Sequence, residues 1–583
     1  MKDLVELPLF LLLFVLMQTH SRAEDSDITF PGEKPNIWKK IFDDVSIRTR
    51  YLTGLTLDVN QTCTVCHMAV DALIQERRGG MTDVQLTAQV DYLCSILLEI
   101  EDERVCNGLI PAHVDIFDFI VDSKKDLSSK RICGLFLQSI GCDADDENNF
   151  KWTIDIPEGN TVDKSVSDGS ESFKVLHLTD IHYDPNYTEG KVDPCGEPLC
   201  CQSDQPDSTH ASTSCGHWAT YNNADSSMKL IEETLRHANE THDFDYVYFT
   251  GDLVSHRVWS TSIENNSAMI SEVFDKFSEY FKVPVFPILG NHEAHPANVY
   301  APEKIAENLS TNWLYKLALS KWTKWLSEEE VKKTILKGGY YTVQAKPGLR
   351  IIVLNNNVCS VDNWWLVYQD NDPYDQLKWL VEVLKASEDK KESVHILSHI
   401  PTASCLKSWA REYNRIIERF ANTITGQFYG HTHLDQFYIY YGSDLKPTNV
   451  AWNGASVVAD KANPNYKLYT VDSKNFNVLD TESWTFNLTK ANENKTTVEW
   501  YSLYTMKKAF DLKSLDPSEM DNLVEKMATN HTLIDSYYKF YHRNSDAAFP
   551  KCTERCQKRI LCEIVNTVPG DDRKCQDLMK LRK

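Results

Sequence analysis

Short apolar runs alternate with longer amphipathic segments through the middle of this chain. The apolar runs have the length and composition of buried strands. They are Phe173–Thr179, Tyr246–Thr250, Val285–Leu289, Leu349–Leu354, Val394–Leu397 and Gln427–Tyr429. The segments between them, with apolar residues at helical spacing, include Ser226–Ala238, Ser271–Tyr280, Gln376–Lys385 and Trp409–Phe420. This alternation predicts an α/β core in which helices cover the sheets.

Residues 59–146 follow a different pattern, because their apolar residues recur only at helical spacing. The amphipathic segments are Val65–Glu76, Val84–Ile100 and Val114–Val121. The cysteines among them are Cys63, Cys66, Cys94, Cys106, Cys133 and Cys142. We therefore predict an all-α unit stapled by disulfides. Six cysteines allow about 15 pairings, and spacing alone does not choose among them.

The predicted α/β core spans residues 173–480, and polar segments adjoin it on both sides. Residues 147–172 are acidic, with glycine and serine near their end, which indicates a linker. Residues 481–583 are predicted to form a helical, disulfide-capped domain. Their cysteines are Cys552, Cys556, Cys562 and Cys575. A zinc site is an alternative for this cluster, but we expect the disulfides Cys552–Cys556 and Cys562–Cys575.

The first residues of the chain are typical of a secretory signal peptide. A basic start is followed by an apolar run from Leu7 to Met17 and a small-residue cleavage site ending at Ala23. The run is too short to span about 30 Å of hydrocarbon, so residues 1–23 are predicted to be removed. Eight glycosylation sequons and 16 cysteines agree with a secreted or lysosomal glycoprotein. The sequons are at Asn60, Asn186, Asn239, Asn265, Asn308, Asn487, Asn494 and Asn530.

The net charge restricts the possible partners of the protein. A formal charge of −23 argues against binding to nucleic acid, which would need a basic surface. The isoelectric point near 5.2 means that most of this charge is lost in an acidic compartment, where self-repulsion then relaxes.

Five short motifs contain the residues that point to chemistry, and each follows a predicted strand. They are Asp180-Ile181-His182, Gly251-Asp252, Gly290-Asn291-His292-Glu293, Ser398-His399 and Gly430-His431-Thr432-His433. Loops that leave the carboxyl ends of strands can direct several side chains to one place. Asp, His and Asn ligands suit two adjacent divalent ions, which can hold the attacking and leaving oxygens of a phosphoester. The motifs therefore predict a metal-dependent phosphoesterase.

In order and spacing, the motifs resemble those of the calcineurin-like metallophosphoesterases. The resemblance implies a four-layer β-sandwich flanked by helices. It also implies that Asp180, His182 and His433 hold one ion, that Asn291, His399 and His431 hold the other, and that Asp252 bridges them. His292 is then the candidate general acid. His256 is a second candidate, which shares that role or binds the phosphate.

Nearly the whole mature chain is similar to the acid sphingomyelinases, because a saposin B-type cysteine pattern precedes the core and a cysteine-bearing helical tail follows it. The similarity includes the strings Leu178 to Pro185, Gly251 to His256 and Gln427 to His433. It implies two Zn2+ ions and hydrolysis of membrane-borne sphingomyelin to ceramide and phosphocholine, with the saposin domain in peripheral contact with the membrane. It also implies the disulfides Cys63–Cys142, Cys66–Cys133, Cys94–Cys106, Cys195–Cys200, Cys201–Cys215 and Cys359–Cys405.

Two other functions are compatible with parts of the chain. A soluble phosphodiesterase acting on nucleotides would need the core alone, and residues 59–146 argue against it. A lipid-binding or lipid-transfer protein with an inactive core would need residues 59–146, but all seven expected ligands are present. A further alternative is that residues 59–146 form a prodomain that packs only on the rest of the chain. We expect a monomer.

Overall fold

The computed structural model describes residues 59–88, 90, 104–142, 150–159, 169–547 and 551–582. The predicted signal peptide, residues 1–23, lies outside this part of the chain. The chain divides into two units. The N-terminal unit contains the described residues up to Lys151 together with Val258–Ser260 and Trp364–Asp370, and the main unit contains the rest.

Two mixed six-stranded sheets form the centre of the main unit. The first sheet has the order β12-β11-β10-β1-β2-β3, with β1, β2 and β3 parallel and the other pairs antiparallel. Its strands are β1 (Ser172–Leu178), β2 (Tyr246–Phe249), β3 (Val285–Pro287), β10 (Asn465–Asp472), β11 (Val478–Phe486) and β12 (Trp500–Thr505).

The second sheet has the order β4-β5-β6-β7-β9-β8, with a parallel centre from β5 to β9 and antiparallel strands at both edges. Its strands are β4 (Tyr341–Lys346), β5 (Leu349–Val353), β6 (Ser393–Leu397), β7 (Ile424–Tyr429), β8 (Gln436–Tyr441) and β9 (Pro447–Asn453).

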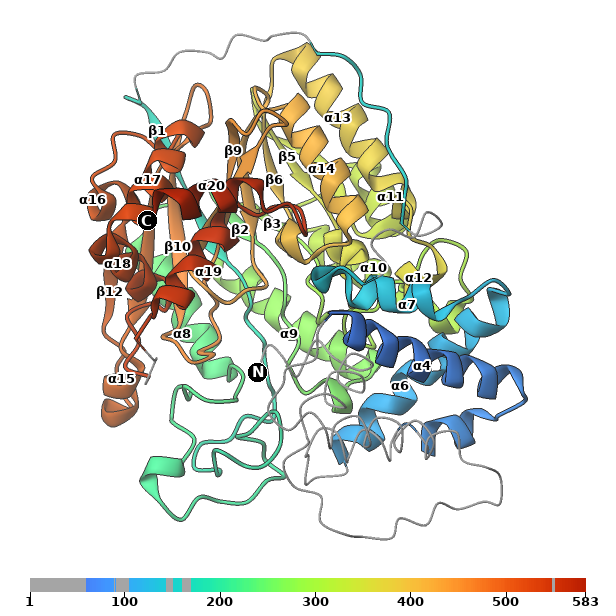
Figure 1. Ribbon diagram of the computed structural model, residues 1–583. Helices are drawn as coiled ribbons and strands as arrows, with labels where there is room; N and C mark the ends of the chain where they lie inside the picture. The colour runs from blue at the N-terminus through green and yellow to red at the C-terminus, as the bar shows by residue number, and fades with distance from the viewer. Residues whose placement is uncertain are drawn as a thin grey trace. The chain divides into compact units, whose positions relative to one another are not determined.

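Helices cover the sheets, which confirms the predicted four-layer α/β architecture (Figure 1). The helices that precede the tail are α8 (Met228–Thr241), α9 (Ile263–Tyr280), α10 (Asn312–Trp322), α11 (Glu329–Gly338), α13 (Gln376–Lys390) and α14 (Lys407–Arg419). Helix α9 packs on the first sheet, where the rings of Phe249 and Phe277 are 5.2 Å apart. Helices α13 and α14 contact one another and the second sheet.

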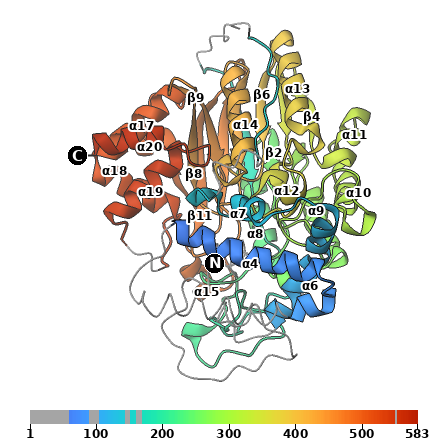
Figure 2. The same cartoon turned by 45° about the vertical axis from the view of Figure 1, so that its right-hand side comes forward.

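Four C-terminal helices, drawn in red tones, gather beside β8 and β9 (Figure 2): α17 (Pro517–Thr529), α18 (His531–Tyr541), α19 (Glu554–Val565) and α20 (Arg573–Leu581). Helix α16 (Met506–Phe510) contacts β11 and β12 instead, and α15 (Leu488–Asn494) lies between these two strands in sequence. Helices α17 and α19 pack directly on β8 and β9. The tail is therefore helical, as predicted, and shares the main hydrophobic core.

The interior between the two sheets is aromatic. The Tyr248 ring on β2 lies 4.9 Å from the Phe428 ring on β7, and the Tyr248 hydroxyl is 2.8 Å from His395 Nδ1 on β6. His395 is fully buried, and burial lowers its pKa to about 4. It is therefore a neutral core histidine.

The first sheet continues beyond the predicted core boundary at residue 480. Strand β11 crosses this boundary, and β12 lies wholly within residues 481–583, which were expected to be helical. The buried face of β11 is polar: Ser483 donates a hydrogen bond to Asp435 Oδ2 (2.8 Å) and Thr485 to the Pro464 carbonyl (2.7 Å). Strands with polar inward residues lack the apolar alternation on which the prediction depended.

Seven disulfides join the described cysteines in the predicted pairs. They are Cys63–Cys142, Cys66–Cys133, Cys195–Cys200, Cys201–Cys215, Cys359–Cys405, Cys552–Cys556 and Cys562–Cys575. Cys106 is also disulfide-bonded, but its predicted partner, Cys94, lies outside the described residues. Such a density of disulfides is typical of proteins that fold in an oxidising compartment.

The main helices of the N-terminal unit are α4 (Val59–Arg78), α6 (Arg104–Ser123) and α7 (Ser129–Phe136), and no strand occurs among its described residues. A short helix, α12 (Trp365–Tyr368), also belongs to this unit. Arg131 binds α12 by donating to the Val367 carbonyl (2.6 Å) and to Asp370 Oδ1 (2.7 Å). Within the described residues, no helix has the length and apolarity needed to cross a membrane.

Part of the predicted linker is fixed to the main unit. Residues 152–159 form neither helix nor strand and lie alongside α14. The Ile154 amide donates to Glu412 Oε2 (3.0 Å), and Arg419 Nε donates to the Pro157 carbonyl (2.8 Å). These hydrogen bonds attach residues 152–159 to α14.

Candidate metal centre

The seven predicted ligands converge at the carboxyl ends of five strands. Asp180 and His182 follow β1, Asp252 follows β2, Asn291 follows β3, His399 follows β6, and His431 and His433 follow β7. Backbone hydrogen bonds join the loops: the Asp180 amide donates to the Gly251 carbonyl (2.9 Å) and the Gly430 amide to the His399 carbonyl (3.0 Å). The two sheets thus contribute ligands to one place.

The ligand atoms form two groups. In the first, His433 Nε2 lies 3.1 Å from His182 Nε2 and 3.5 Å from Asp180 Oδ1. In the second, Asn291 Oδ1 lies 2.7 Å from His399 Nε2 and 2.9 Å from His431 Nδ1. The division is the one implied by the sequence resemblance, with three side chains in each group.

Asp252 lies between the two groups. Its Oδ2 atom is 3.5 Å from His182 Nε2 and 3.1 Å from His399 Nε2. This oxygen is buried and makes no hydrogen bond to a described residue, whereas Oδ1 accepts one from the His292 amide (2.9 Å). An unpaired buried carboxylate oxygen surrounded by imidazoles is costly unless it binds a cation. The side chains therefore fit a two-ion centre.

In three of the four candidate ligand histidines, a hydrogen bond on the far side of the ring fixes which nitrogen can bind a metal. The Nδ1 atoms of His182 and His399 face the carbonyls of Val254 (2.8 Å) and Thr250 (2.6 Å), and Nδ1 of His433 faces Asp460 Oδ2 (3.2 Å). Because these acceptors require a proton on Nδ1, the Nε2 lone pair of each ring is directed into the cluster.

The backbone at the ligands is strained. Positive φ angles between 46° and 69° occur at Asp180, His182, Asp252, His431 and His433. Each such non-glycine residue costs of order 1–3 kcal/mol, and residues of this kind cluster at functional sites. Two neighbouring glycines allow the ligand loops to pack closely against one another. A Cβ atom on Gly290 would lie 2.2 Å from Asp252 Oδ1, and one on Gly430 would lie 2.1 Å from Thr179 Oγ1.

The cluster favours positive charge. Burial opposes the protonation of His399, but the neighbouring Asp252 carboxylate outweighs it and raises the pKa of His399 to about 9. Metal ions bind neutral imidazole, so a bound cation would replace this proton and satisfy the same carboxylate.

His256, the second candidate acid, is paired with a carboxylate. Asp225 Oδ1 is 2.6 Å from His256 Nδ1, and Asp225 Oδ2 accepts hydrogen bonds from the His256 amide (2.6 Å) and from Ser255 Oγ (2.8 Å). Burial disfavours the imidazolium, but the charge and hydrogen bond of Asp225 prevail, so the pKa of His256 is raised above its ordinary value. The His256 ring stacks on His182 at 3.7 Å, which places its Nε2 beside the ligand cluster.

His292 lies against the same rings but has no carboxylate partner. Its ring is 4.6 Å from that of His256 and 4.9 Å from that of His182. Nδ1 is buried without a hydrogen bond to a described residue. Burial lowers the pKa of His292 to about 4, although the charge of Asp252 acts in the opposite direction. The structure thus brings both predicted acids to the site and gives them different electrostatic environments.

The residues that orient the site were not predicted from the sequence. Asp225 orients His256, Asp460 orients His433, and Asn298 accepts a hydrogen bond from Asn291 Nδ2 (2.8 Å). Asn356 Oδ1 accepts from the His399 amide (3.0 Å). These residues lie outside the five motifs, in loops for which we predicted no structure, so no pattern connected them with the ligands.

Comparison with known proteins gives two family matches. The calcineurin-like phosphoesterase model matches residues 173–435, and the model of the acid sphingomyelin phosphodiesterase C-terminal region matches residues 447–578. The sphingomyelin phosphodiesterase of Bos taurus is 34% identical over 89% of this chain and 84% of its own length. That of Homo sapiens is 33% identical over 89% and 83%. A cyclic GMP-AMP phosphodiesterase of Homo sapiens, SMPDL3A, is 27% identical over 67% of this chain and 87% of its own.

Proposed function

Because this chain belongs to the acid sphingomyelin phosphodiesterase family, we propose that it hydrolyses sphingomyelin to ceramide and phosphocholine. The proposal assigns two zinc ions to the centre. Asp180, His182 and His433 would hold the first ion, and Asn291, His399 and His431 would hold the second. Asp252 would be a ligand shared by both.

The position of Asp252 supports this proposal most directly. One buried, unpaired oxygen is within 3.5 Å of an imidazole nitrogen from each ligand group. When bound, two such ions would lower the pKa of a solvent molecule and withdraw charge from the phosphoryl oxygens. A ligand set of nitrogen and oxygen atoms without thiolate suits zinc.

His256 and His292 are assigned the proton transfers. Cleavage of the phosphodiester releases the primary alkoxide of ceramide, which must gain a proton. We assign the donation of this proton to His256, because its Nδ1 is paired with Asp225 at 2.6 Å and its Nε2 remains available. His292, whose Nδ1 is unpaired among the described residues, is assigned a hydrogen bond to the phosphoryl group or the leaving oxygen. A positioned acid of this kind contributes about 10²–10⁴-fold to the rate.

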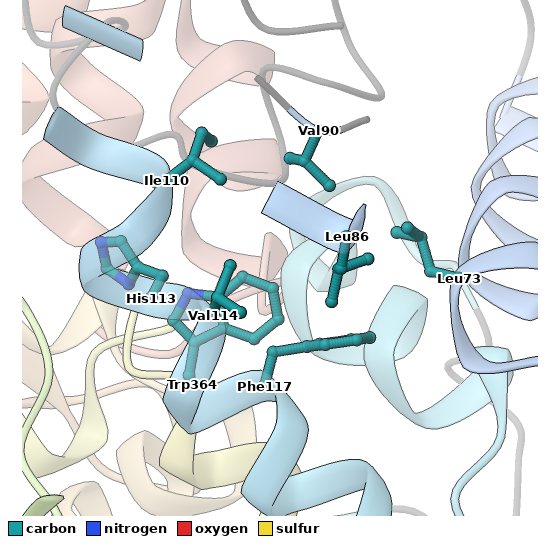
Figure 3. Close-up of a pocket in the computed structure, with 8 residues that line it drawn as sticks. All are labelled: Leu73, Leu86, Val90, Ile110, His113, Val114, Phe117 and Trp364. Atoms are coloured by element: carbon teal, nitrogen blue, oxygen red, sulfur yellow. The ribbon is translucent and has the colours of Figure 1, made fainter. Parts of the chain in front are cut away.

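Within the N-terminal unit, residues 59–146 are proposed to form a saposin B-type domain that engages lipid. It contains an apolar pocket between α4, α6 and the helical residues 83–88 (Figure 3). The pocket is lined by Leu73, Leu86, Val90, Ile110, His113, Val114, Phe117 and Trp364. A lining dominated by aliphatic and aromatic side chains suits a lipid acyl chain, because burial of each CH₂ group contributes about 0.8 kcal/mol.

Filling this pocket is expected to impair hydrolysis of lipid in a membrane but not of a soluble ester. Leu86→Trp adds bulk without charge, and we expect a loss of kcat/KM on sphingomyelin vesicles of about 10–20-fold, because about two fewer CH₂ groups would be accommodated. Turnover of bis(4-nitrophenyl) phosphate should stay within twofold of the native protein. Leu336→Trp, at a residue that is 45% exposed on α11, is the matched control. Equal loss on both substrates would contradict the assignment of the pocket to lipid.

The compartment is proposed to be the secretory pathway, with a secreted or lysosomal product. The disulfides support this assignment, and so does the exposure of the sequon asparagines. All eight lie within the described residues; Asn487 is half-buried and the other seven are exposed. We propose that the protein acts as a glycosylated monomer in peripheral contact with the membrane.

Hydrolysis of a cyclic dinucleotide is the second candidate, because SMPDL3A, a cyclic GMP-AMP phosphodiesterase, matches 67% of the chain. Purified protein should be analysed for bound metal and assayed with both sphingomyelin in mixed micelles and cyclic GMP-AMP. We expect two zinc ions per chain and a kcat/KM at least about 100-fold higher on sphingomyelin. A preference for the dinucleotide would replace the lipid substrate, and metal-free active protein would refute the mechanism.

A further inference from the structure

The loop between β9 and β10, residues 454–464, supports one ligand group of the metal centre. The Val458 amide donates a hydrogen bond to the Asp180 carbonyl (3.1 Å), and the Val457 amide donates one to the Thr179 carbonyl (3.2 Å). Two residues further on, Asp460 Oδ2 lies 3.2 Å from His433 Nδ1. Two members of the first ligand group therefore depend on the conformation of this loop.

A buried arginine from the C-terminal tail holds the other side of the loop. Arg543 follows α18 and is 0% exposed. Its Nη1 atom donates to both the carbonyl (2.8 Å) and the hydroxyl (2.7 Å) of Ser456, and Nη2 lies 3.5 Å from the Asp460 carbonyl. In return, Asn463 Nδ2 donates to the Arg543 carbonyl (3.2 Å). The contacts reach the loop at its beginning, middle and end.

Packing alone does not explain an arginine at this position, because burial of its charge costs free energy. A buried guanidinium loses its hydration, and Nε of Arg543 has no hydrogen-bond partner among the described residues. Burial lowers the pKa of Arg543 to about 10, while the carboxylates of Asp460, Asp435 and Asp180 act to raise it. The negative electrostatic potential at the guanidinium thus comes from carboxylates that include Asp180, a candidate ligand, and Asp460, which contacts His433.

We propose that Arg543 is a positioning residue for the ion site formed by Asp180, His182 and His433. It fixes residues 456–460, which in turn fix the Asp180 backbone and the His433 ring. This inference rests on the ligand assignment made under the proposed function. The other ion site has separate supports, since Asn298 holds Asn291 and both Thr250 and Asn356 hold His399. Loss of Arg543 should therefore weaken one ion site selectively.

The test is zinc stoichiometry and affinity in Arg543→Met, measured on the full chain by elemental analysis across a series of zinc buffers. Partners that orient metal ligands typically affect metal affinity by about 10–100-fold. We expect two-step binding, in which one ion keeps its native affinity and the other is weakened at least about tenfold. Arg543→Lys should recover part of the loss, because it restores the charge and one donor. Arg559→Met, at a side chain that is 65% exposed in the same tail, is the matched control.

Two further variants separate positioning from folding. Ser456→Ala keeps Arg543 and removes one acceptor, so it tests the same link if Arg543→Met does not fold. Asn298→Ala should weaken the other ion and leave the first unchanged. Melting of the metal-stripped proteins reports any general loss of stability.

Three outcomes can be told apart. Selective weakening of one ion in Arg543→Met or Ser456→Ala supports the inference. Native affinity for both ions in the folded variants, whatever their melting temperature or kcat, would overturn it. If the native protein does not bind two ions, the ligand assignment itself fails, and the inference falls with it for that separate reason.

Discussion

Replacing Asp252 by Asn is expected to lower kcat on sphingomyelin by at least about 10³-fold, because the carboxylate proposed to be shared by both ion sites loses its charge. Asp252 Oδ2 stands between His182 and His399, and its other oxygen holds the His292 amide. An amide keeps the shape and one acceptor but offers no charge to offset the repulsion between two cations about 3.5–4 Å apart. Bound zinc should fall from two ions per chain to one or fewer.

The comparison needs a variant with the same chemical change at a distance from the ligands. Asp372→Asn serves this purpose, because Asp372 accepts hydrogen bonds from the Leu377 and Lys378 amides at the start of α13. It should keep two ions and a native kcat. If Asp252→Asn bound two zinc ions and turned over within tenfold of the native rate, the assignment of Asp252 as the shared ligand would be wrong.

Replacing Asp225 by Asn is expected to lower kcat by about 100-fold, because it removes the carboxylate that raises the pKa of His256 and orients its ring. Asp225 raises the pKa of His256 against the effect of burial, so without its charge that pKa falls. A general acid acts in its protonated form, and the protonated fraction declines as pH rises through the pKa. The alkaline limb of the kcat–pH profile should therefore move to lower pH in Asp225→Asn.

Asp184→Asn is the matched control for this experiment. Asp184 is a buried carboxylate near Asp225, but it accepts its hydrogen bonds from Gln202 and from the Asn186 amide. Its neutral variant should keep the native pH profile. Combining Asp225→Asn with His256→Gln tests the route of the effect, since the double variant should be no slower than His256→Gln alone. If the alkaline limb of the profile does not move in Asp225→Asn, His256 is not the group that donates the proton.

Six strands and the candidate metal ligands could be predicted because they have local signals. Strands β1, β2, β3, β5, β6 and β7 are short apolar runs, and the structure places them within three residues of their predicted ends. Each ligand follows such a run directly in sequence. Parallel strands bring their carboxyl ends to one edge, so convergence of Asp180, Asp252 and Asn291 followed from local pattern alone.

Strands β4, β8, β9, β10, β11 and β12 were not predicted. The buried face of β11 includes Ser483 and Thr485, whose hydroxyls are satisfied by partners distant in sequence. The pattern along one strand cannot show that a polar side chain will be buried with an acceptor on another element. The prediction of a helical tail from residue 481 was therefore correct for α15 and for the helices beyond β12, but not for the end of β11 or for β12.

The sequence by itself determined which side chains make up the candidate site: seven Asp, Asn and His residues and two further histidines lie in loops that follow short apolar strands. Only the tertiary structure decided how these side chains are tuned. The unpaired oxygen of Asp252, the pairing of Asp225 with His256 and the hold of Arg543 on residues 456–460 are contacts between segments distant along the chain. Such contacts depend on how the two sheets and the tail pack together, and no local periodicity encodes them.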